Sequence, residues 1–289
     1  IIIELCTRVI LGFSLTLEHP SQLSVAFAMQ RAVFPKDSWL KRINAVGSWP
    51  FYGLMKVLHT DLGSEFLSED YRLAAKRCGI DLRYRVGGQP QHGGHIERFN
   101  GTLMQRIHLL PGATFNHTLK RRVNVKPRYT LSTLETWIAN EITAYHHERH
   151  EGLGTSPAEA WERAWTTKSG LRLPRHLRDE NEFLATFLPY ETRTVTREGI
   201  EWNGLRSRSA ALDPYIKPHV RQGFRYDKRD ISAIRFEPPQ GPHIIVPWIN
   251  VNWDPISLWE WEEIRAHSGR RARIADAETV RRARTQNQR

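Results

Sequence analysis

The sequence predicts an α/β domain followed by a small antiparallel β domain, and three observations lead to this fold class. Strand-like and helix-like apolar spacings alternate along the first part of the chain. Residues 166–188 are polar and broken by Gly and Pro. Beyond them the apolar period changes to two. The predicted boundaries are an α/β domain at 1–165, a linker at 166–188, a β-barrel at 189–252 and a basic helical tail at 253–289.

The elements of the α/β domain follow from local signals. Loose alternation predicts paired strands, and a helix is expected where a start signal precedes apolar residues at helical spacing. In chain order we expect two strands within 1–17, a helix at Ser21–Val33, a strand at Lys56–Thr60, a helix at Ser68–Cys78 ended by Gly79, a strand at Asp81–Val86, a helix from Gly94 and a helix at Thr130–His147.

The second domain is predicted from short strands separated by turn signals such as Glu198-Gly199 and Asn203-Gly204. The expected strands are Thr192–Arg197, Gly199–Trp202, Gly223–Tyr226, Ile231–Phe236 and His243–Trp248. Short strands at such spacing indicate a small antiparallel barrel. From Ser257 onward, apolar residues give way to a basic, helix-compatible tail.

The composition favours a polyanionic partner. The 289 residues include 42 Lys and Arg against 31 Asp and Glu, a formal charge of +11, and nucleic acid is the first candidate. A basic surface kept for solubility is the alternative. Cys6 and Cys78 form neither a disulfide framework nor a zinc site, which fits a reducing cytosol. The chain starts without Met inside an apolar run, so we expect a piece of a longer protein.

Two acids occupy positions where catalysis on an α/β sheet is expected. In HTDLGSEF, residues 59–66, Asp61 ends a predicted strand. Glu97 lies in the first turn of the helix that follows the glycine-rich stretch GGQPQHGG, residues 87–94. Ligands of open α/β sheets bind at the carboxyl ends of the strands. Taken singly, each acid also fits an ordinary capping or solvent-facing role.

These motifs resemble a known family. HTDLGSEF and GGHIERFNGTL, with thirty-five residues between Asp61 and Glu97, resemble the catalytic core of the retroviral integrase and transposase superfamily, whose fold is RNase H-like. Within it the sequence is most similar to Mu-type transposases, especially TnsB-like proteins. YHHERHEGLGTSPAEAW, residues 145–161, resembles the segment that closes the core, and the stretch from GIEWNG to FRYDKRDISAIRF resembles the barrel that follows it.

The resemblance implies a three-carboxylate site with two Mg²⁺ or Mn²⁺ ions, and Glu4, Asp61 and Glu97 match it as catalytic residues and metal ligands. Glu4 stands where the family motif has Asp. One extra methylene moves the carboxylate by about 1.5 Å. The implied reaction is cleavage at transposon ends and transfer of the 3′-hydroxyl into target DNA. An attenuated enzyme, a silent DNA-binding relative and a nuclease that does not join DNA are alternatives.

Further residues are predicted to contact DNA, which would position the backbone without reading the sequence. They are Asn100, Lys120, Arg121, Arg122, Lys126, Arg128, Arg225, Lys228 and Arg229. His146 and His150 raise a weaker zinc hypothesis that lacks further spaced ligands. The resemblance also implies a homo-multimer on paired DNA ends, an AAA+ ATPase regulator bound by the tail, and a bacterial cytoplasmic location at DNA.

Overall fold

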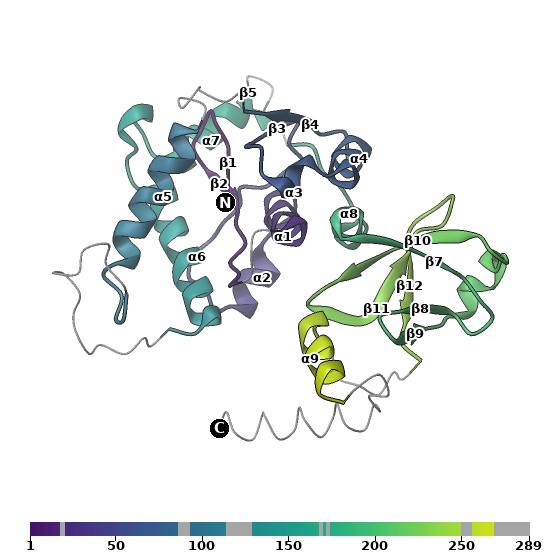
Figure 1. The fold of residues 1–289 in the computed structure, drawn as a ribbon. Helices are drawn as coiled ribbons and strands as arrows, with labels where there is room; N and C mark the ends of the chain where they lie inside the picture. Colours follow the sequence, from purple (N-terminus) through teal and green to yellow (C-terminus); the bar gives the residue numbers. More distant parts are fainter. Residues whose placement is uncertain are drawn as a thin grey trace. The chain divides into compact units, whose positions relative to one another are not determined.

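The computed structural model describes residues 1–17, 21–85, 93–113, 129–167, 170–171, 174–249 and 256–268. The chain divides into unit 1 (Ile1–Leu184) and unit 2 (Ala185–Arg289). Helices predominate in unit 1 and strands in unit 2 (Figure 1). Among the described helices, none combines the length and the apolar character that a membrane crossing requires.

Unit 1 alternates strands and helices, as predicted. In chain order its elements are β1 (Ile2–Ile3), β2 (Ile10–Gly12), α1 (Gln22–Val33), α2 (Asp37–Arg42), β3 (Val57–Thr60), α3 (Ser64–Leu67), α4 (Glu69–Arg77), β4 (Asp81–Tyr84), α5 (Gly94–Ile107), α6 (Leu131–His147), η3 (Glu151–Leu153), α7 (Pro157–Trp165), β5 (Thr166–Thr167), β6 (Gly170–Leu171) and α8 (Glu180–Phe187), which continues into unit 2. The expected helices and strands are all found. Helices α2, α3 and α7 were not expected.

The strands of unit 1 pair in separate two-stranded sheets. β1 and β2 are antiparallel, and β3 and β4 are parallel, with Leu58 opposite Leu82. Parallel neighbours need a crossover connection, which α3 and α4 provide here. No ladder joins these two sheets within the described residues. The α/β architecture is confirmed, whereas the RNase H-like sheet that the resemblance implies is not among these ladders and stays a prediction.

Helix α1 lies against β2 at a contact that only glycine permits. Ser21 caps the helix by accepting a hydrogen bond from the backbone N–H of Ser24. A Cβ atom added to Gly12 would lie 2.5 Å from the Ala28 carbonyl oxygen and 2.8 Å from the Ala32 nitrogen. Both are backbone atoms of α1, so they cannot rotate away as a side chain would. The missing side chain at position 12 therefore sets how closely β2 approaches α1.

Strand β2 is held in unit 1 by hydrogen bonds to buried side chains as well as by its pairing with β1. The Trp49 indole N–H donates to the Ile10 carbonyl at 2.7 Å, and Nε2 of His146 accepts from the Ile10 N–H at 3.0 Å. His146 is fully buried, and burial together with the nearby charge of Lys36 lowers its pKa to about 3. His146 is therefore a core residue whose Nε2 already accepts a hydrogen bond from Ile10. This argues against the zinc hypothesis.

Unit 2 is an antiparallel β domain with a helix at its end. Its elements are β7 (Tyr190–Thr194), β8 (Ile200–Trp202), β9 (Leu205–Ser207), η4 (Ala210–Tyr215), β10 (Arg221–Asp227), β11 (Asp230–Phe236), β12 (Ile244–Pro247) and α9 (Leu258–Ser268). The strand order is β12-β11-β10-β7, and β8 and β9 form a hairpin (Figure 1). The isolated bridge between Ser207 and Trp248 joins this hairpin to the residue after β12. Closure into a barrel stays a prediction.

The turn of the β8–β9 hairpin was predicted from the sequence, whereas its second strand was not. Asn203 and Gly204 both have positive φ, 53° and 76°, as the expected two-residue turn requires. Strand β9 was missed because three residues are too few to show a period of two. Trp261 of α9 donates its indole N–H to the Asn203 carbonyl at 2.9 Å. The start of the predicted tail therefore belongs to the core of unit 2.

The segment predicted as a linker contains ordered structure. Helix α8 falls inside it, and the division between the two units lies within that helix, after Leu184. Phe183 and Phe187 are buried, at 3% and 0% exposure. The helix was missed because its apolar residues are concentrated at its C-terminal end, next to the polar run that indicated a linker.

Substitution of Gly12 tests the contact between β2 and α1. Gly12→Ala is expected to lower the free energy of unfolding by about 1–3 kcal/mol, because the new methyl group meets backbone. Gly101→Ala is the matched control, since nothing lies within 4 Å of that position in α5. There alanine is expected to stabilise by about 0.5–1 kcal/mol. Urea unfolding followed by Trp fluorescence measures both, and equal effects would contradict the packing described.

The buried His146 makes stability depend on pH. An exposed histidine has a pKa of 6.5, whereas His146 in the folded chain has one of about 3. Between these values the unfolded state binds more protons, so stability falls as pH falls, by up to about 1.4 kcal/mol per pH unit. His146→Gln keeps an acceptor for Ile10 but cannot titrate. Urea unfolding at several pH values between 6.5 and 5 should give a steeper slope for the native protein than for this variant. Equal slopes would be inconsistent with a buried neutral imidazole.

Candidate active site

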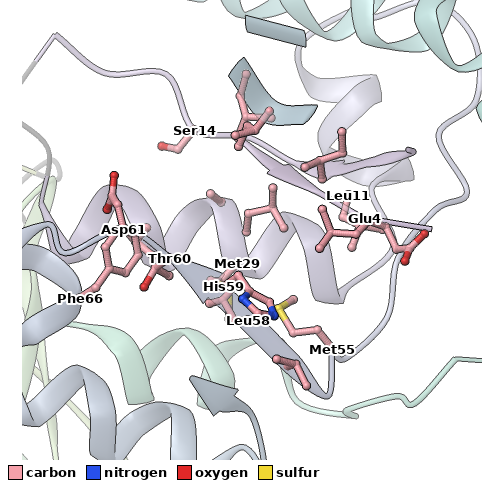
Figure 2. A pocket seen from close by; sticks show the side chains of 18 of the residues that line it. Glu4, Leu11, Ser14, Met29, Met55, Leu58, His59, Thr60, Asp61 and Phe66 are labelled. Carbon is pink, nitrogen blue, oxygen red and sulfur yellow. The ribbon is translucent and has the colours of Figure 1, made fainter. Parts of the chain in front are cut away.

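A pocket of about 780 Å³ lies in unit 1 and is lined by residues of the β1–β2 pair, α1, β3 and the start of α5 (Figure 2). Much of its wall is apolar and includes Ile2, Leu11, Met29 and Leu58. The polar lining residues are Glu4, Ser14, Thr16, Ser24, Lys56, His59, Thr60, Asp61, Arg85 and His95. Two of the three predicted acids therefore border one cavity.

Asp61 lies where the sequence analysis predicted, directly after β3. The parallel pairing of β3 with β4 brings the carboxyl ends of both strands to one edge, and the Arg85 N–H donates to the Thr60 carbonyl at 2.8 Å just beyond the ladder. Oδ1 of Asp61 accepts from the Gly63 N–H at 3.2 Å. The side chain is exposed, and Figure 2 shows its carboxylate at one end of the pocket. Asp61 is thus held at a sheet edge and is open to solvent.

Glu97 lies in the first turn of α5, also as predicted. Its carboxylate is 3.6 Å from Nη1 of Arg85, and its side chain is 65% exposed. Glu97 is not among the pocket-lining residues, although His95 and Ile96 beside it are. Arg85 therefore links the sheet edge that carries Asp61 to the helix that carries Glu97. The sequence analysis missed Arg85; its signal is a basic residue at the end of a strand, immediately before the glycine-rich stretch.

Helix α5 is fixed by contacts to α6. Phe99 and Leu103 are buried, and the ring of Phe99 packs edge-on against Tyr145 with centroids 4.8 Å apart. Arg106 pairs with Glu141 and Glu148, each at 2.7 Å. These two carboxylates raise the pKa of Arg106 further, so the guanidinium stays charged. The pairing aligns the helix that presents Glu97.

Glu4 is engaged in its own turn. Oε1 accepts from the Cys6 N–H at 2.9 Å, while Oε2 accepts from both the N–H and the hydroxyl of Thr7 at 2.6 Å. In Figure 2 the carboxylates of Glu4 and Asp61 lie at opposite ends of the pocket and point away from each other. The carboxylate of Glu4 thus caps the turn between β1 and β2.

The acids do not fit a shared metal site in this geometry. Both oxygens of Glu4 have donors, and Glu97 has a guanidinium partner. No three His, Cys, Asp or Glu side chains converge enough to hold a metal ion in the part of the chain that the structure describes. The two metal ions that the resemblance implies therefore stay a prediction.

The residues predicted to contact DNA have different surroundings. The prediction is wrong for Arg225, which is 3% exposed, pairs with Glu237 at 3.2 Å and donates to the Leu188 carbonyl at 2.8 Å. Arg229 is exposed and pairs with Asp227 at 3.1 Å. Lys228 and Asn100 are half-buried. The remaining predicted contacts, Lys120, Arg121, Arg122, Lys126 and Arg128, lie outside the described residues.

Comparison with known proteins agrees with this organisation. Residues 1–112 match the family model of the TnsB C-terminal domain, and residues 185–245 match that of the Mu transposase C-terminal domain. Two separate parts of the chain are thus similar to TnsB and Mu transposases. The first match ends after α5, so it covers the acids at 4, 61 and 97, and the second falls entirely in unit 2. The family resemblance is thereby confirmed.

Individual relatives support the same assignment. The transposase for transposon Tn552 of Staphylococcus aureus is 25% identical over 242 residues, which is 81% of this chain and 45% of that protein. The chain thus spans less than half the length of this relative. The Pol polyprotein of radiation murine leukemia virus (strain Kaplan) is 36% identical over 66 residues, which is 23% of this chain and 11% of that protein.

A solved structure was also found. It is the simian T-cell lymphotropic virus intasome in complex with the PP2A regulatory subunit B56 gamma, with 14% identity, 80% of this chain and 63% of the other covered, and a TM-score of 0.30.

The turn closed by Glu4 can be tested through stability. Glu4→Ala removes an acceptor of three hydrogen bonds and is expected to lower the free energy of unfolding by about 1.5–3 kcal/mol. Thr7→Val removes only the hydroxyl donor, and a decrease of about 0.5–1.5 kcal/mol is expected. Ser132→Ala, on the exposed surface of α6, is the control. Urea unfolding measures all three. A Glu4→Ala variant as stable as the native chain would exclude the capping role.

Proposed function

We propose that this chain is the part of a DNA transposase that carries the site of phosphodiester transfer and the β domain that follows it. The observation that carries the proposal is the order of the two family matches, with Asp61 and Glu97 inside the first match on the elements where the motif requires them. We propose that unit 1 has the RNase H-like fold of the Mu-type catalytic core and that unit 2 has the fold of the Mu-type barrel. The structure supports this through its alternating unit 1 and its antiparallel unit 2.

The proposed reaction has two phosphodiester displacements at one site. In the first, a water oxygen attacks a phosphorus atom at the transposon end, the bond to the 3′-oxygen breaks, and a free 3′-hydroxyl remains. In the second, this hydroxyl attacks a phosphodiester of target DNA and displaces another 3′-oxygen. Asp61 and Glu97 are the acids proposed to serve both steps, with Mg²⁺ or Mn²⁺ as the expected cofactor. Arg85, between them, is a cation able to meet a phosphate oxygen.

The proposed partners follow from charge and from the relatives. DNA is the substrate that a chain of net charge +11 favours. A homo-multimer on paired DNA ends is proposed from the family resemblance. An AAA+ ATPase bound by the basic tail stays a prediction, because residues 269–289 lie outside the described part of the chain.

A second candidate function is a DNA-binding relative with attenuated or silent catalysis. The observation that favours it is the position of Glu4, whose carboxylate closes a turn at the far end of the pocket from Asp61. The transposase motif has Asp at this position, and a displacement of about 1 Å in a catalytic group can reduce a rate about a hundredfold. In this alternative the chain binds DNA at the same surface without joining it.

Asp61→Asn tests the proposed enzyme. The variant should lose DNA joining by about a hundredfold or more, because the amide removes a charge from the site, while DNA binding changes by less than about twofold. A gel assay with a pre-cut end, a plasmid target and Mg²⁺ measures joining, and fluorescence anisotropy measures binding.

Normal joining by the Asp61→Asn variant would refute the assigned site. Glu4→Asp, assayed in parallel, separates the two candidate functions. A rise in joining supports an enzyme attenuated at position 4, whereas no joining by either the native chain or this variant, with DNA binding retained, supports the silent relative.

A further inference from the structure

Four nitrogen-bearing side chains lie on three segments of unit 1 that pack around Tyr145, and none is assigned a role by the proposed reaction. Arg8 belongs to the turn between β1 and β2, His95 and Arg98 lie in the first turns of α5, and His150 follows α6. His95 lines the pocket together with Asp61 and Arg85. Arg98 is exposed, and the other three are half-buried.

Tyr145 holds these segments together. Its hydroxyl donates to the Arg8 carbonyl at 3.1 Å. Its ring packs against Phe99, the residue after Arg98, with centroids 4.8 Å apart. The centroid of the same ring lies 6.5 Å from that of His150. One core side chain thus places the turn, α5 and the residue after α6 around a common point.

The four groups act on one another electrostatically. The pKa of His95 is lowered first by burial and then by Arg8, Arg98 and His150. The pKa of His150 is likewise lowered first by burial and then by Arg8 and Arg98, against a small opposing effect of Glu151. Groups that shift one another in this way share one local positive field. The lowered pKa values favour neutral imidazoles, so the positive charge of the cluster comes from the guanidinium groups of Arg8 and Arg98.

This field is poorly compensated by the protein. In the part of the chain that the structure describes, neither Arg8 nor Arg98 has an ion pair, and Nδ1 of His150 is buried without a hydrogen-bond partner. Several arginines of unit 2 differ in this respect, because Arg206, Arg208 and Arg229 each pair with a carboxylate. Gly93 offers no side chain to cap α5, and the acid in the first turn of that helix is Glu97.

We propose that Arg8, His95, Arg98 and His150 form a phosphate-binding surface that holds the DNA backbone against the mouth of the candidate active site. The inference rests on the proposed function, which supplies DNA as the partner. Two guanidinium groups from different segments, with imidazole N–H donors between them, match the spaced charges of a polyphosphate chain. His95 of the cluster lines the pocket that Asp61 also lines, so a DNA backbone held by the cluster would run along the mouth of that pocket.

This surface differs from the DNA-binding residues expected from the sequence. Those residues were sought in basic runs, and Arg8, Arg98 and His150 lie in no such run. They meet only because the β1–β2 turn, α5 and the end of α6 pack around Tyr145. The surface is predicted to bind phosphates without reading bases, because long cationic side chains on a turn and a helix end carry no base-specific pattern.

The test compares two double variants of the full chain that remove the same charge. Arg8→Gln with Arg98→Gln neutralises the cluster. Arg42→Gln with Arg163→Gln neutralises two exposed arginines of unit 1 outside it. Binding of a short fluorescent duplex is measured by anisotropy between about 50 and 200 mM salt. Circular dichroism checks that each variant is folded.

The cluster variant is expected to bind about tenfold more weakly. The slope of log K against log salt should become less steep by about two, because two phosphates are no longer neutralised by arginine. The control pair should change affinity by less than about threefold and leave the slope unchanged. Equal weakening by both pairs overturns the surface while leaving the proposed function in place. A native chain that binds no duplex at any salt overturns both.

If the cluster variant proves unfolded, Arg98→Glu replaces it, because Arg98 is exposed on α5. Arg163→Glu is then the control. Charge reversal at Arg98 should weaken binding by more than tenfold and by clearly more than reversal at Arg163. The same weakening at both positions would reject the proposed surface.

Discussion

The close approach of β2 to α1 is the constraint on which the rest of unit 1 depends. Gly12 lets the strand meet the helix backbone, and the N–H and carbonyl of Ile10 bond to His146 and Trp49 in place of a further strand. This fixes the β1–β2 pair, and with it the wall of the pocket and the turn that carries Glu4 and Arg8. A shift of β2 would move both an acid of the family motif, Glu4, and a proposed phosphate ligand, Arg8.

The three acids of the family motif differ in the hydrogen bonds and ion pairs that their carboxylates already make. Asp61 accepts one backbone hydrogen bond and stays exposed, and Glu97 has a loose guanidinium partner at 3.6 Å. Glu4 accepts three hydrogen bonds, two of them at 2.6 Å. Since removing a carboxylate from such donors costs free energy, Glu4 is the acid least available to a substrate or an ion.

Among the described residues, some arginines pair with a carboxylate and others do not. For binding a polyanion this difference matters more than the net charge of the chain. Arg225 is buried beside Glu237, and Arg106 connects α5 to α6 through two glutamates, so both support the fold. Arg8 and Arg98 have no carboxylate partner among the described residues, and both lower the pKa of His95, which lines the pocket. A polyanion gains most from charges of the second kind, because no internal ion pair must be broken to bind it.

The sequence by itself determined helices α1, α4, α5 and α6 and strands β1 to β4 of unit 1, the turn at Asn203-Gly204, and the positions of Asp61 and Glu97, because apolar spacing, caps and turn chemistry are local signals. Tertiary structure alone decided that Arg225 is buried, that α8 is ordered, and that Glu4 turns away from Asp61. It also brought Arg8, Arg98 and His150 together around Tyr145. These outcomes depend on contacts between residues far apart in the chain, and no window of sequence contains both partners of such a contact.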